Sequence, residues 1–80
     1  MYGKLCVGNL PSSVTEADLQ TKFEQFGCVL SVAIEMDATT GRRKRSGLVE
    51  MRTPAEAQAA INRLNMTLYD DAIISVYRID

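Results

Sequence analysis

The fold is decided by two stretches of sequence, KRSGLVEM at residues 44–51 and LCVGNL at residues 5–10. Successive residues of a β-strand point to opposite faces of a sheet, so an alternating pattern shows which side chains share a face. In the longer stretch Val49 and Met51 fall on one face, and the charged Glu50 falls on the other. We therefore predict two strands that each bury one face and leave the other face toward solvent.

Two further segments are short and rich in branched residues, which is typical of strands. The predicted strands are Lys4 to Gly8, Val29 to Asp37, Arg45 to Arg52 and Ala72 to Arg78. The stretch Thr39-Thr40-Gly41 has the residue types of a tight turn, so the second and third strands should form an antiparallel hairpin.

Two helices are predicted between these strands by their capping residues. Thr15 is followed by Asp18 three positions later, and Thr53 is followed by Glu56 at the same spacing, which is the pattern of a capping box. Pro54 occupies the first turn of the second helix, where its missing N–H has no cost. The resulting order of elements is βαββαβ.

This order predicts an α+β fold, a ferredoxin-like βαββαβ sandwich with a four-stranded antiparallel sheet and two helices on one face. We expect residues 1–80 to form one domain. The side chains expected beneath the helices are Leu5, Val7, Val32, Ile34, Val49, Met51, Ile74 and Val76. Those expected on the open face are Cys6, Ala33, Glu35, Ser46, Leu48, Glu50, Ile73, Ser75 and Tyr77.

Composition narrows the classes of function. The 80 residues are 46% hydrophobic and 24% charged, include two cysteines and contain no histidine, which is the commonest general base and metal ligand. We therefore expect no enzyme activity, no metal and no cofactor. No apolar run is long enough to span a bilayer, so we expect no membrane association and an intracellular protein, cytoplasmic or nuclear, with free thiols.

One local cluster of positive charge stands out against the net charge of −1. Arg42, Arg43, Lys44 and Arg45 follow one another in what the pattern predicts to be the loop at the tip of the hairpin. Such a run can contact phosphates, serve as a nuclear import signal or simply be solvated. These alternatives remain open at this point.

The two stretches resemble the signature strands of the RNA recognition motif family. LCVGNL is similar to its first-strand motif, and KRSGLVEM is similar to its third-strand motif, with Lys44, Gly47 and Val49 retained. Arg45 stands where the family has a glycine. The order and spacing of the supporting matches extend the resemblance over essentially the whole chain.

The resemblance implies binding of single-stranded RNA, or of single-stranded DNA by the same chemistry. Three positions that are usually aromatic in the family, and that stack bases there, are Cys6, Ser46 and Leu48 in this chain. Because stacking contributes about 1 to 3 kcal/mol per base, their loss predicts weak or atypical binding through the basic hairpin and a reduced sheet surface. The candidate RNA-binding residues are Lys4, Cys6, Asn9, Arg42, Arg43, Lys44, Arg45, Ser46, Leu48, Tyr77 and Arg78.

A second hypothesis is a protein-interaction or self-association module that uses the open sheet face. Its residues form a mildly apolar patch, namely Cys6, Ala33, Leu48, Ile73 and Tyr77. Tyr77 can serve either hypothesis, as a stacking ring or as a packing residue. Tyr69, in the predicted loop before the last strand, is expected to fill the core.

Catalysis is the least favoured class. The same fold is used by acylphosphatases and by small metal-transfer domains, but the loop after the first strand, residues 8–13, contains neither a basic residue nor a cysteine pair. Ser12, Ser13 and Thr15 are better explained as loop and capping residues than as nucleophiles.

Overall fold

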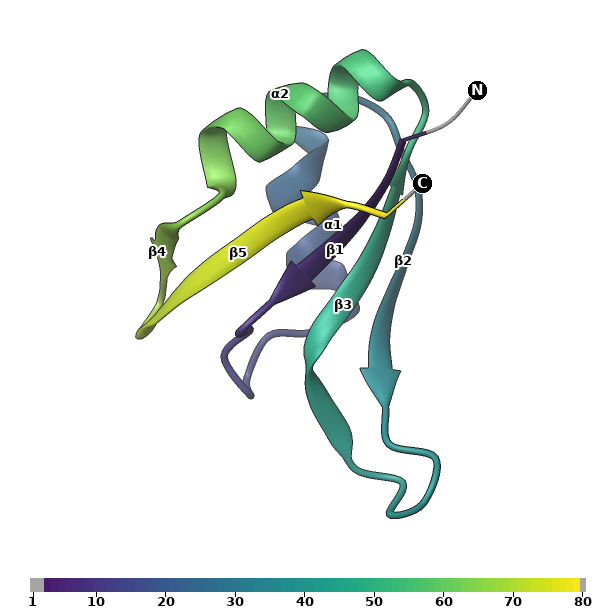
Figure 1. Ribbon diagram of the computed structural model, residues 1–80, viewed down its shortest axis with the longest axis vertical. Coiled ribbons are helices and arrows are strands. Elements are labelled where there is room, and N and C mark those ends of the chain that lie inside the picture. Colours follow the sequence, from purple (N-terminus) through teal and green to yellow (C-terminus); the bar gives the residue numbers. More distant parts are fainter. Residues whose placement is uncertain (1–2, 80) are drawn as a thin grey trace.

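The structure, a computed structural model, describes residues 3–79 and contains seven elements. They are β1 (Gly3–Gly8), α1 (Glu16–Glu24), β2 (Val29–Met36), β3 (Arg43–Met51), α2 (Pro54–Leu64), β4 (Thr67–Tyr69) and β5 (Ala72–Arg78). The strands form one sheet in the order β2-β3-β1-β5-β4, and all neighbouring strands are antiparallel (Figure 1). The predicted α+β class, two helices and antiparallel sheet are confirmed.

The prediction of four strands is wrong in one respect, because β4 adds a fifth strand at the edge beside β5. Thr67 pairs with Ile74 and Tyr69 pairs with Ala72, across a turn in which Asp70 has a φ of 55°. A strand of three residues is too short to show a recognisable period. Tyr69 therefore lies in a strand rather than in a loop, although it packs against the core as expected.

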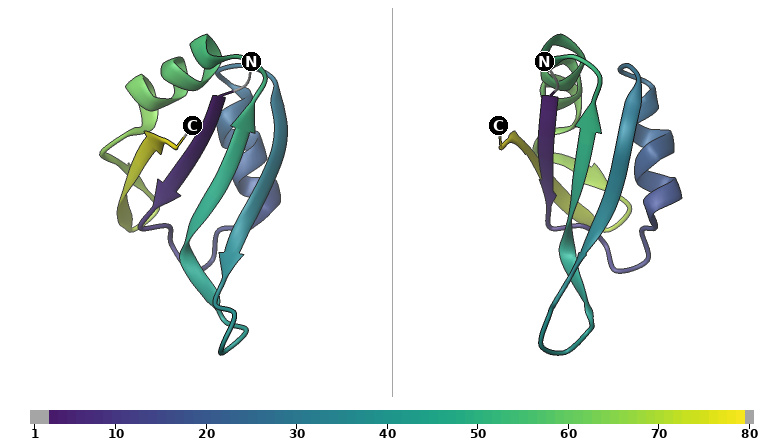
Figure 2. Two further views of the ribbon diagram at one scale, coloured as in Figure 1. Left: turned by 45° about the vertical axis from the view of Figure 1, so that its right-hand side comes forward. Right: turned by 90° about the vertical axis from the view of Figure 1, so that its right-hand side faces the viewer.

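The core lies between the sheet and the two helices, which cover one face of it (Figure 2). From the strands it receives the expected side chains, and Leu5, Val7, Met51 and Ile74 are completely buried. Val32 and Ile34, on the outer strand β2, are only partly buried against it. The side-chain alternation read from the sequence therefore assigns the faces correctly.

Capping residues begin both helices at the predicted positions. The Thr15 side chain accepts from the Asp18 N–H and the Asp18 carboxylate accepts from the Thr15 N–H, which completes the box at α1. The Thr53 hydroxyl caps α2 by accepting from the N–H of Glu56. The Glu56 carboxylate in turn accepts from the Thr53 hydroxyl and, at 2.8 Å, from the N–H of Cys28 beyond α1.

The hairpin of β2 and β3 extends beyond the body of the domain (Figure 1). Its turn is closed by Asp37, whose carboxylate accepts from the N–H groups of Thr39 and Thr40, and by Gly41 with a φ of 73°. These two hydrogen bonds lower the pKa of Asp37, and the bond from Thr40 has the larger effect. Neither helix within residues 3–79 is long and apolar enough to cross a bilayer.

Candidate nucleic-acid interface

The strand register arranges the open face of the sheet in three rows that run across the strands. The middle row is apolar, because Ala33 pairs with Leu48, Leu48 pairs with Cys6, and Cys6 pairs with Tyr77. The other two rows are more polar. We call them the lower row, on the side of the hairpin tip, and the upper row, on the side of the chain ends.

The middle row corrects one expectation, because Cys6 is buried rather than exposed, with 8% of its surface accessible. Its two cross-strand partners, Leu48 and Tyr77, are larger and cover the small thiol from both sides. They remain 38% and 51% exposed. Cys6 therefore supports the row from below and is not available as a contact surface.

Tyr77 is the one ring exposed on this face among residues 3–79. The neighbouring Cys6 side chain is the largest cause of the raised pKa of Tyr77. The phenol therefore remains neutral throughout the neutral pH range. The ring lies on the other side of Cys6 from Leu48, because β1 separates β5 from β3.

The lower row consists of Glu35, Ser46, Gly8 and Ser75. Gly8 pairs with Ser46 on one side and with Ser75 on the other. The Ser46 hydroxyl donates to the Glu35 carboxylate at 2.7 Å, so both side chains have partners. With no ring and one carboxylate, this row offers little to a base or to a phosphate.

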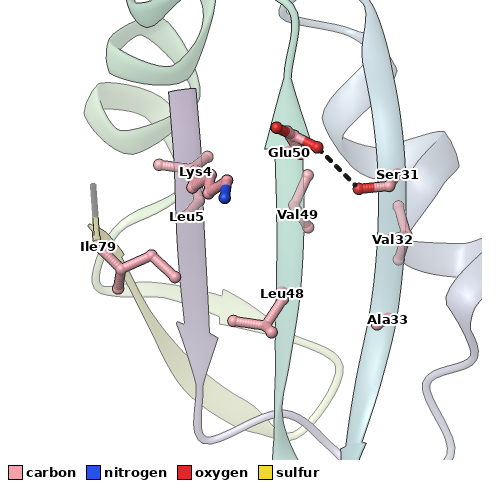
Figure 3. A pocket seen from close by; sticks show the side chains of 9 residues that line it. All are labelled: Lys4, Leu5, Ser31, Val32, Ala33, Leu48, Val49, Glu50 and Ile79. Carbon is pink, nitrogen blue, oxygen red and sulfur yellow. Dashed lines mark hydrogen bonds between the residues drawn. The ribbon is translucent and has the colours of Figure 1, made fainter. Parts of the chain in front are cut away.

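The upper row consists of Ser31, Glu50, Lys4 and Ile79. Glu50 pairs with Ser31 and with Lys4, and the N–H of Ile79 donates to the Lys4 carbonyl at 3.0 Å. A hollow of about 250 Å³ lies between this row and the middle row (Figure 3). It brings charged groups of both signs next to apolar side chains.

The basic run does not form the free cluster at the tip that the sequence predicts, because β3 already begins at Arg43 and only Arg42 remains in the loop. The Arg43 guanidinium donates to the carbonyls of Ser12 and Val14, and the Arg45 Nε donates to the Leu10 carbonyl at 3.0 Å. These carbonyls belong to the loop between β1 and α1, which has no strand partner to satisfy them.

The basic residues at the start of β3 fall into two groups, because successive side chains of the strand point to opposite faces. Arg43 and Arg45 point toward the helix side, where they hold the loop. Lys44 therefore points toward the open face together with Ser46, Leu48 and Glu50. The cations that remain for phosphates at this end of the molecule are Lys44 and the loop residue Arg42.

Two other predicted residues lie at the borders of the face. Asn9 has a φ of 59°, and its side-chain amide donates to the Ile73 carbonyl at 2.8 Å, so it connects the end of β1 to β5. Arg78 pairs with Leu5 at the end of β5, on the opposite side of the strand from Tyr77. Lys4, in contrast, lies directly on the open face.

Sequence reasoning missed three residues of the face, namely Ser31, Leu68 and Ile79. Leu68 pairs with Ile73 at the far edge, and these two side chains are 63% and 46% exposed. Ile79 is 48% exposed, and the alternation past Tyr77 could have placed it. By the same rule, Ser31 shares a face with Ala33. Leu68 could not be placed from the sequence, because its strand is too short to show an alternating pattern.

The comparisons with known proteins agree with this geometry. The family model described as RNA recognition motif matches residues 5–75. The protein RbpA of Synechocystis sp. is 44% identical over 59 residues, which cover 74% of this chain and 58% of RbpA. The chain thus spans little more than half the length of that relative.

Two solved structures superimpose closely on the chain. The crystal structure of RNA Binding Protein PG1 has a TM-score of 0.90 at 32% identity and covers 96% of this chain and 93% of that one. The Sxl-lethal protein/RNA complex has a TM-score of 0.83 at 33% identity, and the match covers 92% of this chain and 46% of that one. The second structure is thus named as a complex that contains RNA.

Proposed function

The chain belongs to the RNA recognition motif family, and from this premise we propose that it binds single-stranded RNA across the open face of its sheet. The observation that carries the proposal is the middle row, where Tyr77 and Leu48 are exposed on either side of the buried Cys6. A base can stack on the Tyr77 ring while its neighbour contacts Leu48. This is a binding role and requires no catalytic group.

The affinity should be low for a physical reason. One ring on the face provides about 1 to 3 kcal/mol of stacking, where typical members of the family use three rings. Glu35 and Glu50 on the same face repel phosphates. Arg42 and Lys44 offset part of this repulsion at the hairpin, where the phosphate backbone can pass.

Fluorescence anisotropy with labelled random single-stranded RNA at low salt tests the proposal. We expect saturable binding that weakens as salt is raised, and weaker binding by a Tyr77→Ala variant. Single-stranded DNA of the same length is the comparison that shows whether the 2′-hydroxyl contributes. Absence of any association at low salt would contradict the proposal.

A second candidate function is self-association through the open face. It is favoured by the exposure of Leu68 and Ile73, which lie side by side at the far edge and away from the middle row. Light scattering at high protein concentration should then show a dimer, which Leu68→Glu abolishes. A monomer at all concentrations would contradict self-association.

We also propose an intracellular location. The support is that Cys6 and Cys28 are both free thiols, as is usual in a reducing compartment. Labelling of unreduced protein from its native source with a thiol reagent would test this, and a mixed disulfide at Cys28 would argue against it.

A further inference from the structure

The hollow between the upper and middle rows has a shape and a chemistry that stacking on Tyr77 does not explain. Its open-face lining consists of Lys4, Ser31, Ala33, Leu48, Glu50 and Ile79. Its volume of about 250 Å³ is below the roughly 300 to 1,000 Å³ of sites for drug-sized ligands, so it suits a single ring system. Figure 3 shows these side chains around one depression that spans β1, β2 and β3.

Apolar side chains form two sides of the hollow. Ile79 and Leu48 are 48% and 38% exposed, and Ala33 lies beyond Leu48 on β2. The hydrogen bond from the Ile79 N–H to the Lys4 carbonyl fixes the chain after β5 beside β1. A flat ring in the hollow would therefore contact aliphatic groups that the sheet already holds in place.

The Glu50 carboxylate gives the hollow its polarity. Its Oε1 accepts from the Ser31 hydroxyl at 3.4 Å, which is a long contact, and a carboxylate has about four acceptor positions. A carboxylate repels a phosphate but accepts readily from N–H groups. On the Glu50 side of the hollow, the part of an RNA chain that fits is therefore the edge of a base and not the backbone.

The four bases differ in how well they match a carboxylate. Guanine alone has two adjacent donors on its Watson–Crick edge, the N1–H and the N2 amino group. Adenine and cytosine place an acceptor next to their amino group, and uracil places a carbonyl on each side of its one N–H. Unpaired bases are commonly read at this edge by proteins that bind single-stranded RNA.

We propose that the hollow binds one guanine, with the Glu50 carboxylate accepting from both N1–H and the N2 amino group. The inference rests on the proposed function and names the base that the site prefers. Lys4, which also lines the hollow, has an ammonium with three donors, one of which can serve the guanine O6. Glu50 is then a specificity-determining residue of this chain.

The test uses labelled heptauridine in which the central uridine is kept or is replaced by guanosine, inosine, adenosine or cytidine. Wild-type protein should bind the guanosine oligonucleotide about tenfold more tightly than the adenosine and cytidine ones, within the range that bidentate base contacts provide. Inosine lacks the N2 amino group and should fall between them. In Glu50→Gln the guanosine advantage should shrink to about twofold or less, because an amide has one acceptor oxygen.

Glu35→Gln is the matched control. It removes the same charge from the same face, but Glu35 bonds to Ser46 and does not line the hollow. Its guanosine preference should equal that of the wild type. Equal binding of all five oligonucleotides, or an unchanged preference in Glu50→Gln, would overturn the guanine inference while the proposed function stands. Absence of binding to every oligonucleotide at low salt would overturn both.

Discussion

An aromatic ring and a guanidinium are both side chains that commonly bind RNA, but Tyr77 and Arg43 have different roles in this chain. Tyr77 pairs with Cys6 across β5 and β1 and presents its ring to solvent. Arg43 has a charge suited to phosphates, yet its guanidinium is directed to the carbonyls of Ser12 and Val14. The first residue should therefore affect affinity, and the second should affect stability.

Replacement of Tyr77 by Ala should weaken RNA binding by about 1 to 3 kcal/mol, the value of one stacked base. Tyr77→Phe is the control, because it keeps the ring and loses only the hydroxyl. We expect its affinity to remain close to wild type in an anisotropy titration. Equal losses in both variants would show that the hydroxyl, and not the ring, is the important group.

Replacement of Arg43 by Gln should lower the free energy of unfolding by about 1 to 2 kcal/mol, because two loop carbonyls lose a charged donor. Arg42→Gln removes the same charge from the adjacent loop position and should change stability by less than about 0.5 kcal/mol. Urea denaturation followed by circular dichroism measures both. Equal stability of the two variants would mean that the guanidinium of Arg43 does not hold the loop.

The start of α2 stabilises the segment that connects α1 to β2. The Glu56 carboxylate reaches across to the N–H of Cys28, where the chain enters β2. Gly27, with a φ of 155°, leaves room for this carboxylate, and a side chain there would collide with it. The start of α2 is thereby connected to the segment between α1 and β2 through a charged group as well as through the core.

This arrangement predicts a dependence of stability on pH. The hydrogen bond from Cys28, followed by that from Thr53, lowers the pKa of Glu56 in the folded state. Its contribution is therefore fully present above the ordinary glutamate pKa and is lost as the pH falls through the lower, folded value. Glu56→Gln should be less stable than wild type at about pH 7, and the difference should shrink toward about pH 3.

Glu24→Gln serves as the control for this experiment, because Glu24 ends α1 and is exposed. Thermal unfolding across the pH range should show no comparable change in its difference from wild type. A difference for Glu56→Gln that stays constant with pH would mean that the ionised carboxylate is not the stabilising species.

At the scale of the whole molecule, base contacts and phosphate contacts are separated along the long axis. The described part measures 35 × 25 × 19 Å, and the hairpin extends along its longest direction (Figure 1). Lys44 and Glu50 are six residues apart on β3, which corresponds to about 20 Å. An RNA strand that follows β3 would thus meet cations at one end and the hollow at the other.

Salt dependence should reflect the two cations that the hairpin offers to phosphates, Arg42 and Lys44. If Arg42 and Lys44 each neutralise one phosphate, the slope of log affinity against log salt is about −1.4 for single-stranded RNA. Affinity should then fall about sevenfold between about 50 and 200 mM salt. Lys44→Gln should reduce the magnitude of the slope by about 0.7, whereas a wild-type slope of about −2.8 would show that Arg43 and Arg45 also contact phosphates.

Local patterns in the sequence were sufficient for the architecture and for part of the site. Alternation assigned the faces of β1, β3 and β5, and capping residues located both helices, since these signals depend on neighbours within a few positions. The same patterns placed Leu48, Glu50 and Tyr77 on the open face. They missed β4 because three residues show no period, and they missed Ile79 because it follows the last residue of the predicted strand.

Contacts between distant segments were decided only by the tertiary structure. By residue type alone, the four consecutive cations are equally suited to contact phosphates. In the structure, Arg43 and Arg45 donate to backbone carbonyls of the loop after β1 instead. Cys6 is buried because β3 and β5 place larger side chains on both sides of it. Alternation within β1, β3 and β5 is a local property, so it shows which way a side chain points. What covers that side chain or bonds to it depends on strands that are far away along the chain.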